Sequence, residues 1–355
     1  MRIFIDINHP SHVHFFKEFI LRGKELGHEF LITARDKDCI LRLCRAYDIP
    51  FISKGTGATS LIGKAINMVR ELIFIYRKVR VFKPSLYVSF ASPYAAITGF
   101  LLKKPVITFD DTEPDPLLHN LFPRFSTFIL TPACYEKDFG SKHIRFRGYK
   151  ESTYLRTYPV PTNIRRDLGV KDEFPLVMMR FVKQNATHAR GQKGISPENR
   201  LHLVKTFSTM AHVLISTEST LPEPLRSYQI DPPPEKMHDL IASCSLLIGE
   251  STTMAAEAAL LNVPSICIEN KGRGYIKELQ EKYKIIKWFT ESQQKEALSY
   301  AEQWFQQLSK QSTPEVRQQI LARTTDITEM LLWLIRYFPS SLDVLKDDPE
   351  KIKEF

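Results

Sequence analysis

The sequence predicts an α/β protein made of two doubly wound parallel sheets, followed by a helical C-terminus. Three observations support this fold class. Short apolar runs alternate with helix-like stretches in the first half, the alternation restarts after a looser segment over Arg147–Pro175, and the chain is helix-like from Glu291 onward. Such alternation is typical of βαβ units with a parallel sheet. At 355 residues the chain is near the upper size of a single core, so we expect two domains.

The first half carries the strand and helix patterns of one such sheet. Its apolar runs are near-continuous, as in Val106–Phe109, which indicates strands covered on both faces. The predicted strands are Ile3–Ile7, Glu29–Thr33, Leu86–Phe90, Pro105–Phe109 and Thr127–Thr131. The predicted helices include His14–Leu26, Ile40–Tyr47 and Leu61–Phe82.

The pattern restarts after Pro175 with a second set of elements. The predicted strands are Leu176–Phe181, His212–Ser216, Ser245–Ile248 and Ser265–Glu269. The predicted helices are Pro197–Phe207, Glu235–Ala242, Thr252–Leu261 and Glu315–Tyr337. We therefore expect an N-terminal domain over residues 1–165, a C-terminal domain over 166–312, a helix over 313–340 that can cross back to the first domain, and a charged tail over 341–355 that frays.

The charge balance points to an acidic partner. Lys plus Arg number 49 and Asp plus Glu number 40, which gives a net charge of +9. This excess suits a nucleotide, a phospholipid surface or a nucleic acid and does not choose among them. Because the basic residues are spread along the chain and no nucleic-acid motif is present, we expect no nucleic-acid partner.

The cysteines and the apolar runs bear on location. Five cysteines are scattered without a CxxC pair, which excludes a disulfide scaffold and a zinc ribbon and fits a reducing cytosol. The N-terminus is too short and too soon acidic for a signal peptide. The longest uncharged run, Ser85–Leu102, contains Pro93 and Gly99, which indicates strand, turn and helix rather than a membrane span. We expect a cytoplasmic protein, with peripheral contact at the inner face of the membrane left open.

The most informative motif lies in the second half, over Leu246–Pro264. A buried strand ends at Gly249, Ser251 is a good N-cap, and a helix begins at Thr252-Thr253. The amino end of a helix presents free N–H groups and a positive dipole, which suits a phosphate group. Glu257, in the next turns, is placed to accept hydrogen bonds from ribose hydroxyls. The alternative is a well-capped helix without a ligand.

Polar residues also follow the predicted strands of the first half. Asn8 to His14 contain three histidines; with no fourth ligand nearby we expect no metal, and instead a cleft-lining role for His9 and His12 in acceptor binding or proton transfer. In the alternative, His14 faces solvent and only one of the others reaches the cleft. Asp110-Asp111-Thr112-Glu113 follows another strand, and its carboxylates offer a divalent-cation site or a general base, or else form a solvated acidic turn. Ser92 and Tyr94, after a third strand, are candidates for acceptor binding.

Two basic loops and one basic helix complete the motifs. The first loop carries Arg180, Lys183, His188, Arg190 and Lys193, and the second is Lys271-Gly272-Arg273-Gly274-Tyr275. Both can neutralise a pyrophosphate or lie as solvated surface. The helix Leu61–Phe82 combines apolar and basic residues and could rest on an anionic bilayer. Its basic positions do not share one narrow face, so a core helix with solvated ends is the favoured interpretation.

Several of these motifs resemble known families. Met237-His238-Asp239-Leu240-Ile241-Ala242 through Pro264 resembles the donor-nucleotide motif of GT-B glycosyltransferases and non-hydrolysing UDP-N-acetylglucosamine 2-epimerases. Asp6–Phe16, Ser89–Ala96 and Phe109–Glu113 resemble an uncharacterised prokaryotic domain-of-unknown-function family with a predicted GT-B fold. The resemblance covers roughly residues 1 to 340. It implies two Rossmann-like domains that face a central cleft, and fold analogy does not by itself carry the reaction.

The resemblance also implies roles for single residues. Ser251 matches the Ser that binds phosphate in these families and Glu257 the Glu that binds ribose. Glu113 or Asp111 best matches a Glu in the cleft of the epimerases and of a related lipid-linked N-acetylglucosaminyltransferase. Two departures are Glu250, where an Asp is frequent, and Thr252-Thr253 in place of a Gly pair, whose Cβ atoms hinder close approach of a pyrophosphate.

We therefore expect a nucleotide-sugar-dependent enzyme, with a UDP-sugar as donor substrate and no other cofactor. The leading hypothesis is a glycosyltransferase of cell-surface polysaccharide or glycolipid synthesis, with a sugar or lipid-linked acceptor. The alternatives are a UDP-N-acetylglucosamine 2-epimerase-like enzyme and an inactive nucleotide-sugar-binding protein. The expected catalytic residues are His9, His12, Asp111 and Glu113. The expected nucleotide-sugar ligands are Arg180, His188, Lys193, His238, Gly249, Ser251, Thr252, Thr253, Glu257 and Arg273, and the expected acceptor ligands are Asn8, Ser92 and Tyr94.

Overall fold

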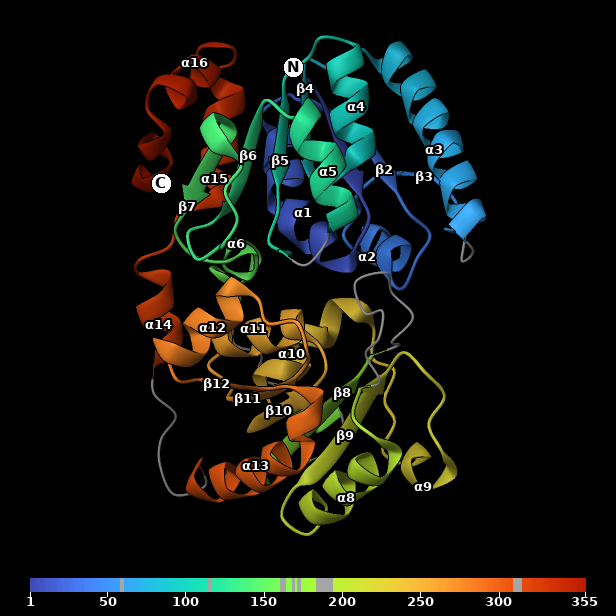
Figure 1. Ribbon diagram of the computed structural model, residues 1–355, viewed down its shortest axis with the longest axis vertical. Coiled ribbons are helices and arrows are strands. Elements are labelled where there is room, and N and C mark those ends of the chain that lie inside the picture. Colours follow the sequence, from blue (N-terminus) through green and yellow to red (C-terminus); the bar gives the residue numbers. More distant parts are fainter. Residues whose placement is uncertain are drawn as a thin grey trace. The chain divides into compact units, whose positions relative to one another are not determined.

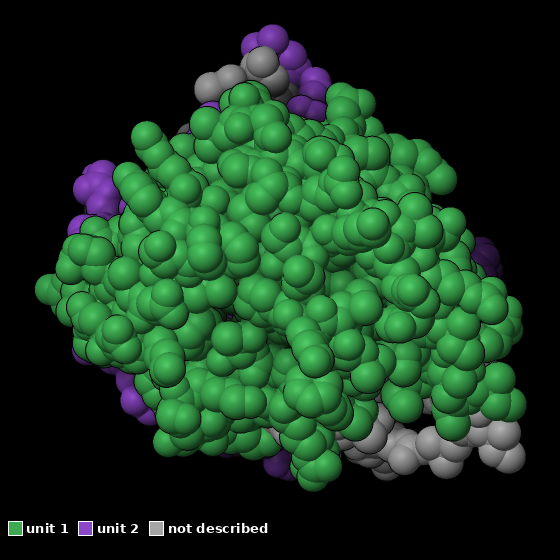
Figure 2. All heavy atoms as spheres, turned by 90° about the horizontal axis from the view of Figure 1, so that it is seen from above, with its two compact units in different colours: residues 1–154, 323–355 green, residues 155–322 purple. Residues whose placement is uncertain are grey.

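The chain divides into two units, which the computed structural model describes over residues 1–57, 61–113, 116–159, 164–167, 170, 174–182, 194–308 and 315–355. Unit 1 comprises Met1–Tyr154 and Arg323–Phe355, and unit 2 comprises Leu155–Ala322. Figure 1 shows the elements of each unit, and Figure 2 colours the units separately. Unit 1 is therefore built from both ends of the chain, and unit 2 from the segment between them.

Unit 1 contains a parallel sheet in the order β3-β2-β1-β4-β5-β6-β7. Its strands are β1 (Arg2–Ile7), β2 (Glu29–Ala34), β3 (Ile52–Ser53), β4 (Leu86–Phe90), β5 (Val106–Phe109), β6 (Phe128–Pro132) and β7 (His143–Phe146). The five predicted strands are all present, and the sequence did not reveal β3 and β7. Strands β2 and β3 are added on one side of β1, and strands β4 to β7 are added on its other side. We call this position, between β1 and β4, the switch point of the sheet, where open α/β sheets bind ligands.

Helices cover both faces of this sheet. They are α1 (Pro10–Glu25), α2 (Ile40–Ala46), α3 (Leu61–Phe82), α4 (Pro93–Leu101), α5 (Pro116–Phe125), η1 (Gly140–Lys142) and α6 (Lys150–Leu155). Helix α1 begins four residues before the prediction, because His9 caps it and Pro10 fills its first position. Helix α3 has the predicted bounds. The buried side of α1, with Phe15, Phe16 and Phe19, packs into the core of the unit.

The C-terminal segment completes this core and corrects two expectations. The predicted single helix Glu315–Tyr337 is interrupted: α14 (Val316–Leu321) ends, Asp326 caps a new helix, and α15 (Ile327–Arg336) follows. The charged tail does not fray. It forms α16 (Ser340–Asp347) and η5 (Pro349–Glu354), and its apolar residues Leu345 and Ile352 are completely buried against the core.

Unit 2 contains a second parallel sheet, in the order β12-β11-β10-β8-β9. Its strands are β8 (Leu176–Phe181), β9 (His212–Thr217), β10 (Leu246–Gly249), β11 (Ser265–Ile268) and β12 (Ile286–Phe289), the last of which was not predicted. Its helices are α7 (Ile164–Asp167), α8 (Pro197–Phe207), α9 (Glu223–Arg226), η3 (Pro234–Lys236), α10 (Met237–Ala242), α11 (Thr252–Leu260), α12 (Gly274–Glu281), η4 (Glu291–Gln293), α13 (Gln294–Leu308) and α14. The predicted helix Glu235–Ala242 is thus divided between η3 and α10. The switch point of this sheet lies between β8 and β10.

Both units are doubly wound α/β structures with parallel sheets, as the sequence predicts. No helix in the part of the chain that the structure describes combines the length and apolar character needed to cross a bilayer. The loops that follow the strands at each switch point are therefore the places to look for chemistry.

Candidate functional site

The amino end of α11 lies at the switch point of the unit 2 sheet. Ser251 caps this helix in an extended conformation, and its Oγ accepts a hydrogen bond from the N–H of Met254 at 3.3 Å. The N–H groups of Thr252 and Thr253 belong to the first turn, which a helix leaves without intrahelical acceptors. Together with the helix dipole, these groups can bind a phosphate.

Gly249 allows the strand before α11 to approach its neighbour closely. A Cβ atom at this position would lie 2.5 Å from the carbonyl oxygen of Arg180 on β8. Any larger residue would push β8 and β10 apart, directly beneath the start of α11. Gly249 therefore shapes the switch point through packing of the two strands.

Helix α11 also carries a buried acid–imidazole pair. Glu257 Oε1 lies 3.1 Å from His238 Nε2, and both side chains are almost completely buried. The ring of Tyr158 packs edge-on against His238 at 5.6 Å, and its hydroxyl donates to Asp239. The structure thus brings together His238 and Glu257, which the sequence assigned to the same binding site.

Glu250 holds both ends of the basic loop that follows β8. Its Oε2 accepts from the N–H of Val182 at 2.8 Å, its Oε1 accepts from the N–H of Ile195 at 2.6 Å, and Arg200 lies 3.1 Å from Oε1. The predicted ligands His188 and Lys193, and with them Lys183 and Arg190, lie outside the described residues. Glu250, noted in the sequence only as a departure from Asp, is therefore the anchor of this loop.

The two other basic residues of the predicted donor site have different settings. Arg180 is directed towards β9: it donates to Ser216 Oγ at 2.7 Å and pairs with Glu218. Arg273 occupies the N-cap position of α12, and its guanidinium lies 3.4 Å from the hydroxyl of Tyr275. The partners of Arg180 thus lie on the β9 side of β8, whereas the switch point lies on the β10 side.

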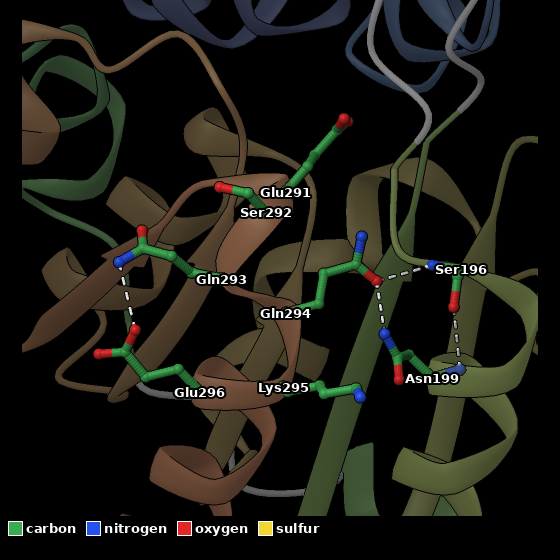
Figure 3. Close-up of a pocket in the computed structure, with 8 residues that line it drawn as sticks. All are labelled: Ser196, Asn199, Glu291, Ser292, Gln293, Gln294, Lys295 and Glu296. Carbon is green, nitrogen blue, oxygen red and sulfur yellow. Dashed lines mark hydrogen bonds between the residues drawn. The ribbon is translucent and has the colours of Figure 1, made fainter.

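A cavity of about 480 Å³ lies between the start of α8 and the start of α13 (Figure 3). Gln294 Oε1 accepts from the N–H of Ser196 at 2.9 Å and from the amide of Asn199 at 2.7 Å. Glu291 Oε1 accepts from the N–H of Gly194 at 2.7 Å. These polar groups hold Gly194 and the start of α8. Among the predicted site residues that the structure describes, none lines this cavity.

In unit 1, Asp6 is the centre of a buried network at the switch point. Its carboxylate accepts from Thr33 and Ser92, each at 2.6 Å, and from Asn8 at 2.8 Å, and it pairs with Lys54 at 2.7 Å. Burial raises the pKa of Asp6, but the Lys54 ammonium and the hydroxyl donors outweigh it and hold the pKa below its usual value. The predicted acceptor ligand Ser92 therefore joins the ends of β4 and β1, and the predicted acceptor ligand Asn8 joins the end of β1 to Lys54.

A second buried acid continues this network. Glu71 on α3 pairs with Arg35 at 2.7 Å and lies 3.7 Å from Lys54. The hydroxyl of Tyr94 lies 3.4 Å from Arg35, and its ring faces the Lys54 ammonium at 4.9 Å. Tyr94, the third predicted acceptor ligand, is thus part of the same charged cluster.

The carboxylates after β5 form a separate group. Asp111 pairs with Lys150 at 2.7 Å, and both side chains are about 4% exposed. Asp110 accepts from the hydroxyl of Tyr135, whose pKa is raised by burial and then by this carboxylate, so that the phenol stays protonated. Glu113 follows in the same loop and is 8% exposed. The structure therefore places the predicted acids Asp111 and Glu113 at the carboxyl end of β5.

His12 lies near both ion pairs. Its ring stacks on Phe90 at 4.7 Å, and its charged neighbours are Lys150 and Asp111 on one hand and Asp6 and Lys54 on the other. Burial first and then Lys150 lower the pKa of His12 to about 3, so the imidazole is neutral at ordinary pH. Its Nδ1 is buried without a hydrogen-bond partner in the part of the chain that the structure describes.

The other two histidines contact neighbouring side chains. His9 is exposed and caps α1, with its Nδ1 2.7 Å from Ser11 Oγ, and its ring lies 5.7 Å from that of His12. One interpretation of the sequence had His14 facing solvent, and the structure shows that this is wrong. His14 is buried, with Nδ1 3.2 Å from the hydroxyl of Tyr47 and its ring beside Tyr154. The structure thus brings His9 and His12 to the switch point and His14 away from it.

Sequence reasoning missed the basic partners of this site. Lys54, Arg35 and Lys150 were not singled out, although each stands shortly after a strand. Asp6 offered a signal of its own, because an acid within an otherwise apolar strand demands a buried partner. No group of three or more His, Cys, Asp or Glu side chains in the described part of the chain is arranged to hold a metal ion.

Comparison with known sequences relates most of the chain to one family. Residues 1–308 match the family described as "Protein of unknown function (DUF354)". An uncharacterized protein of Methanocaldococcus jannaschii is 26% identical over 299 residues, which cover 80% of this chain and 86% of the relative.

Comparison with solved structures relates both units to one fold. A candidate UDP-N-acetylglucosamine 2-epimerase from Listeria monocytogenes is similar with a TM-score of 0.70 at 12% identity, over 96% of this chain and 97% of its own. UDP-GlcNAc 2-epimerase from Neisseria meningitidis, bound to UDP-GlcNAc, has a TM-score of 0.66 at 14% identity, over 95% and 100%. The spinosyn rhamnosyltransferase SpnG, complexed with spinosyn aglycone, has a TM-score of 0.56 at 13% identity, over 98% and 99%. The predicted GT-B-like fold is thereby confirmed.

Proposed function

The chain belongs to the DUF354 family, as its motifs predict, and from that premise we propose that it is a nucleotide-sugar-dependent glycosyltransferase with a UDP-sugar as donor. The observation that carries the proposal is the amino end of α11 at the switch point of unit 2, with Ser251 as its cap. This position offers N–H groups and a positive dipole end to a diphosphate. The relatives in fold that are solved with UDP-GlcNAc or with a glycosyl acceptor support the choice of substrate class.

The donor would be held by groups of unit 2. The diphosphate would accept hydrogen bonds from the first-turn N–H groups of Thr252 and Thr253. Glu257, fixed by His238 at 3.1 Å, would accept from the ribose hydroxyls. Glu250 holds Val182 and Ile195, which flank the basic segment, and the basic side chains of that segment would neutralise the phosphates.

The acceptor would be activated by groups of unit 1. Glycosyl transfer requires a base that removes the proton of the acceptor hydroxyl as that oxygen bonds to the sugar. His12 suits this role poorly, because an imidazole with a pKa of about 3 is a weak base. Asp111 is paired with Lys150. Glu113, which lies in the loop after β5 and matches the Glu that the resemblance places in the cleft, is the proposed base. The buried Nδ1 of His12 would accept a hydrogen bond from a sugar hydroxyl.

An epimerase is the second candidate, and a specific observation favours it. The fold similarity to the 2-epimerases is higher than that to the glycosyltransferase, with TM-scores of 0.70 and 0.66 against 0.56. An epimerase would use the same donor site and the same acids after β5 to move a proton on the sugar itself, without an acceptor.

The setting of the reaction is part of the proposal. All five cysteines are thiols, three of them buried, which supports a reducing, cytoplasmic location. Cell-surface polysaccharide or glycolipid synthesis would consume the product there, through a sugar or lipid-linked acceptor.

The test is turnover with purified protein and a panel of UDP-sugars, followed by NMR of the anomeric region. Release of UDP that depends on an added sugar acceptor supports the transferase, whereas a new UDP-sugar formed without acceptor supports the epimerase. Glu113→Gln should abolish either reaction and leave UDP binding unchanged, whereas the matched control Glu25→Gln, at an exposed position of α1, should have no effect. UDP binding without turnover in the wild type would identify a binding protein, and no binding of any nucleotide would refute the proposal.

A further inference from the structure

Helix α3 presents an aliphatic and basic face to solvent. Its inner side is formed by Glu71, Ile75 and Val79, which are at most 3% exposed and follow at intervals of four residues. The opposite side carries Ile66, Val69, Ile73 and Val81, with exposed fractions of 57%, 53%, 48% and 82%. An ordinary surface helix reverses this pattern, with polar residues on the outer side.

The charges on the outer side of α3 have one sign. Arg70, Arg77 and Arg80 are exposed and share the turns of the outer aliphatic residues. Glu71 is the only acid between Leu61 and Lys83, and it is buried against Arg35. From the sequence we expected that the basic residues of this helix do not share one narrow face. The structure resolves this, because the inner side of the helix holds the acid and the outer side holds the three arginines.

The same character continues beside the helix. A groove of about 650 Å³ runs along its flank, lined by apolar and basic side chains and by one acid, Glu71, which is paired with Arg35. The lining residues are Lys54, Asn67, Arg70, Glu71, Ile73, Phe74, Arg77, Lys78 and Val81. Helix α4 packs against α3 and ends in Phe100 and Leu101, each 57% exposed, followed by exposed Lys103 and Lys104. Helix α3 leads by a short turn into β4, and α4 leads likewise into the neighbouring strand β5. The carboxyl ends of both helices therefore lie near the amino ends of these two parallel strands. Figure 1 shows α3 at the outer margin of unit 1.

We propose that the outer face of α3 docks unit 1 onto an anionic phospholipid bilayer, with the helix lying in the plane of the surface. The aliphatic side chains would enter the boundary between headgroups and acyl chains, and the arginines would pair with lipid phosphates. Such docking needs no membrane-spanning segment. The 22-residue helix is about 33 Å long, enough to contact several lipids at once.

The experiment is co-sedimentation of the full-length protein with large vesicles. Vesicles of phosphatidylglycerol and phosphatidylcholine in equal parts should retain the protein at low salt, and pure phosphatidylcholine vesicles should not. The double variant Arg70→Glu/Arg77→Glu should weaken retention at least about tenfold, because each basic residue contributes near the surface. Val69→Ser/Ile73→Ser, which leaves the charges intact, should also weaken it.

A matched control separates the face from net charge. Lys205→Glu/Lys346→Glu makes the same charge change at exposed positions on α8 and α16 and should retain wild-type binding. Equal loss in this control, equal retention on neutral vesicles, or no retention at all would overturn the proposal. Sedimentation velocity tests whether a second copy of the chain binds this face instead. A dimer that dissociates in the Ile73→Ser variant would assign the face to self-association and would also overturn the proposal.

Discussion

Lys54 Nζ lies 2.7 Å from Asp6 Oδ1, and both side chains are completely buried. Asp6 is the penultimate residue of β1, whereas Lys54 follows β3, which is separated from β1 by β2. The pair therefore links β1 to the end of β3 across β2 and holds the carboxyl ends of these strands together beside the switch point. Because the carboxylate also accepts from Thr33, Asn8 and Ser92, the charge has donors on every side.

Removing one member of this pair should be strongly destabilising. Asp6→Asn removes the nearer of two carboxylates beside the buried Lys54 ammonium and leaves Glu71, which is 3.7 Å away and paired with Arg35. The expected loss in free energy of unfolding is about 3 kcal/mol. Because the pKa of Asp6 is lowered in the folded state, the stability from its charge is present above the ordinary value of 3.8 and is lost as pH falls below it. Urea unfolding at neutral pH measures the loss.

The double variant Asp6→Asn/Lys54→Met is the control for this prediction. It removes both charges and should recover part of the stability. Glu29→Gln, which breaks the exposed pair with Arg2, should change stability by less than about 1 kcal/mol. An Asp6→Asn variant as stable as the wild type would show that the buried pair is not needed for the fold.

His12 should make the protein sensitive to mild acid. Its pKa is lowered to about 3 in the folded state against 6.5 for the free side chain, so the unfolded chain binds an extra proton between these values. Stability from this site is therefore complete above pH 6.5 and falls as pH decreases towards 3. Between pH 6.5 and 5 the loss should be about 2 kcal/mol.

The measurement compares unfolding free energies of wild type and His12→Phe across this pH range. The Phe ring keeps the stack on Phe90 and cannot titrate, so the variant should lose about 2 kcal/mol less than the wild type between pH 6.5 and 5. His202→Phe, at an exposed position of α8, should keep the wild-type slope. Parallel slopes for wild type and His12→Phe would contradict a neutral, buried His12.

Much of the fold could be predicted from the sequence because its strands are apolar and its helices amphipathic. Leu61–Phe82 and Leu176–Phe181 have the predicted bounds. The missed strands β7 and β12 have only four residues each and include charged side chains, as in His143-Ile144-Arg145-Phe146. In the tail, the two buried apolar residues Leu345 and Ile352 stand among many charges, so the composition indicated fraying although packing prevails.

The candidate site could be predicted only in part. Residues such as His12, Asp111 and Ser251 were singled out because each follows a strand, and that rule needs no knowledge of strand order. Their partners depend on strand order. Lys54 meets Asp6 because β3 lies two places from β1 in the sheet. Lys150 meets Asp111 because β7, which precedes Lys150, lies two places from β5, which precedes Asp111. Nothing in the local sequence specifies these pairings.

The tail of the chain should contribute directly to the stability of unit 1. Leu345 on α16 is completely buried in the main core, so Leu345→Ala should cost about 2–5 kcal/mol. Its neighbour Val344 is 38% exposed, and Val344→Ala should cost less than about 1 kcal/mol. Chemical denaturation of both variants tests this. Equal, small losses would indicate a tail that is detached in solution.

The first-turn N–H of Thr252 should be a determinant of nucleotide binding. Thr252→Pro removes this N–H while it keeps the helix, because proline is accepted at the first helical position. Ser251 already has the extended conformation, with φ −105° and ψ 109°, that a following proline requires. The protein itself uses this arrangement at α4, where Ser92 is the cap and Pro93 the first residue.

Calorimetry with UDP should therefore separate the N–H from the hydroxyl of Thr252. Thr252→Pro should raise the Kd at least about tenfold, the effect of one lost hydrogen bond to a charged group. Thr252→Val keeps the N–H and the shape of the side chain and should change the Kd less than about threefold. Similar thermal stabilities of the two variants exclude unfolding as the cause. If both bind UDP as the wild type does, the diphosphate does not bind at the amino end of α11, and the donor site lies elsewhere.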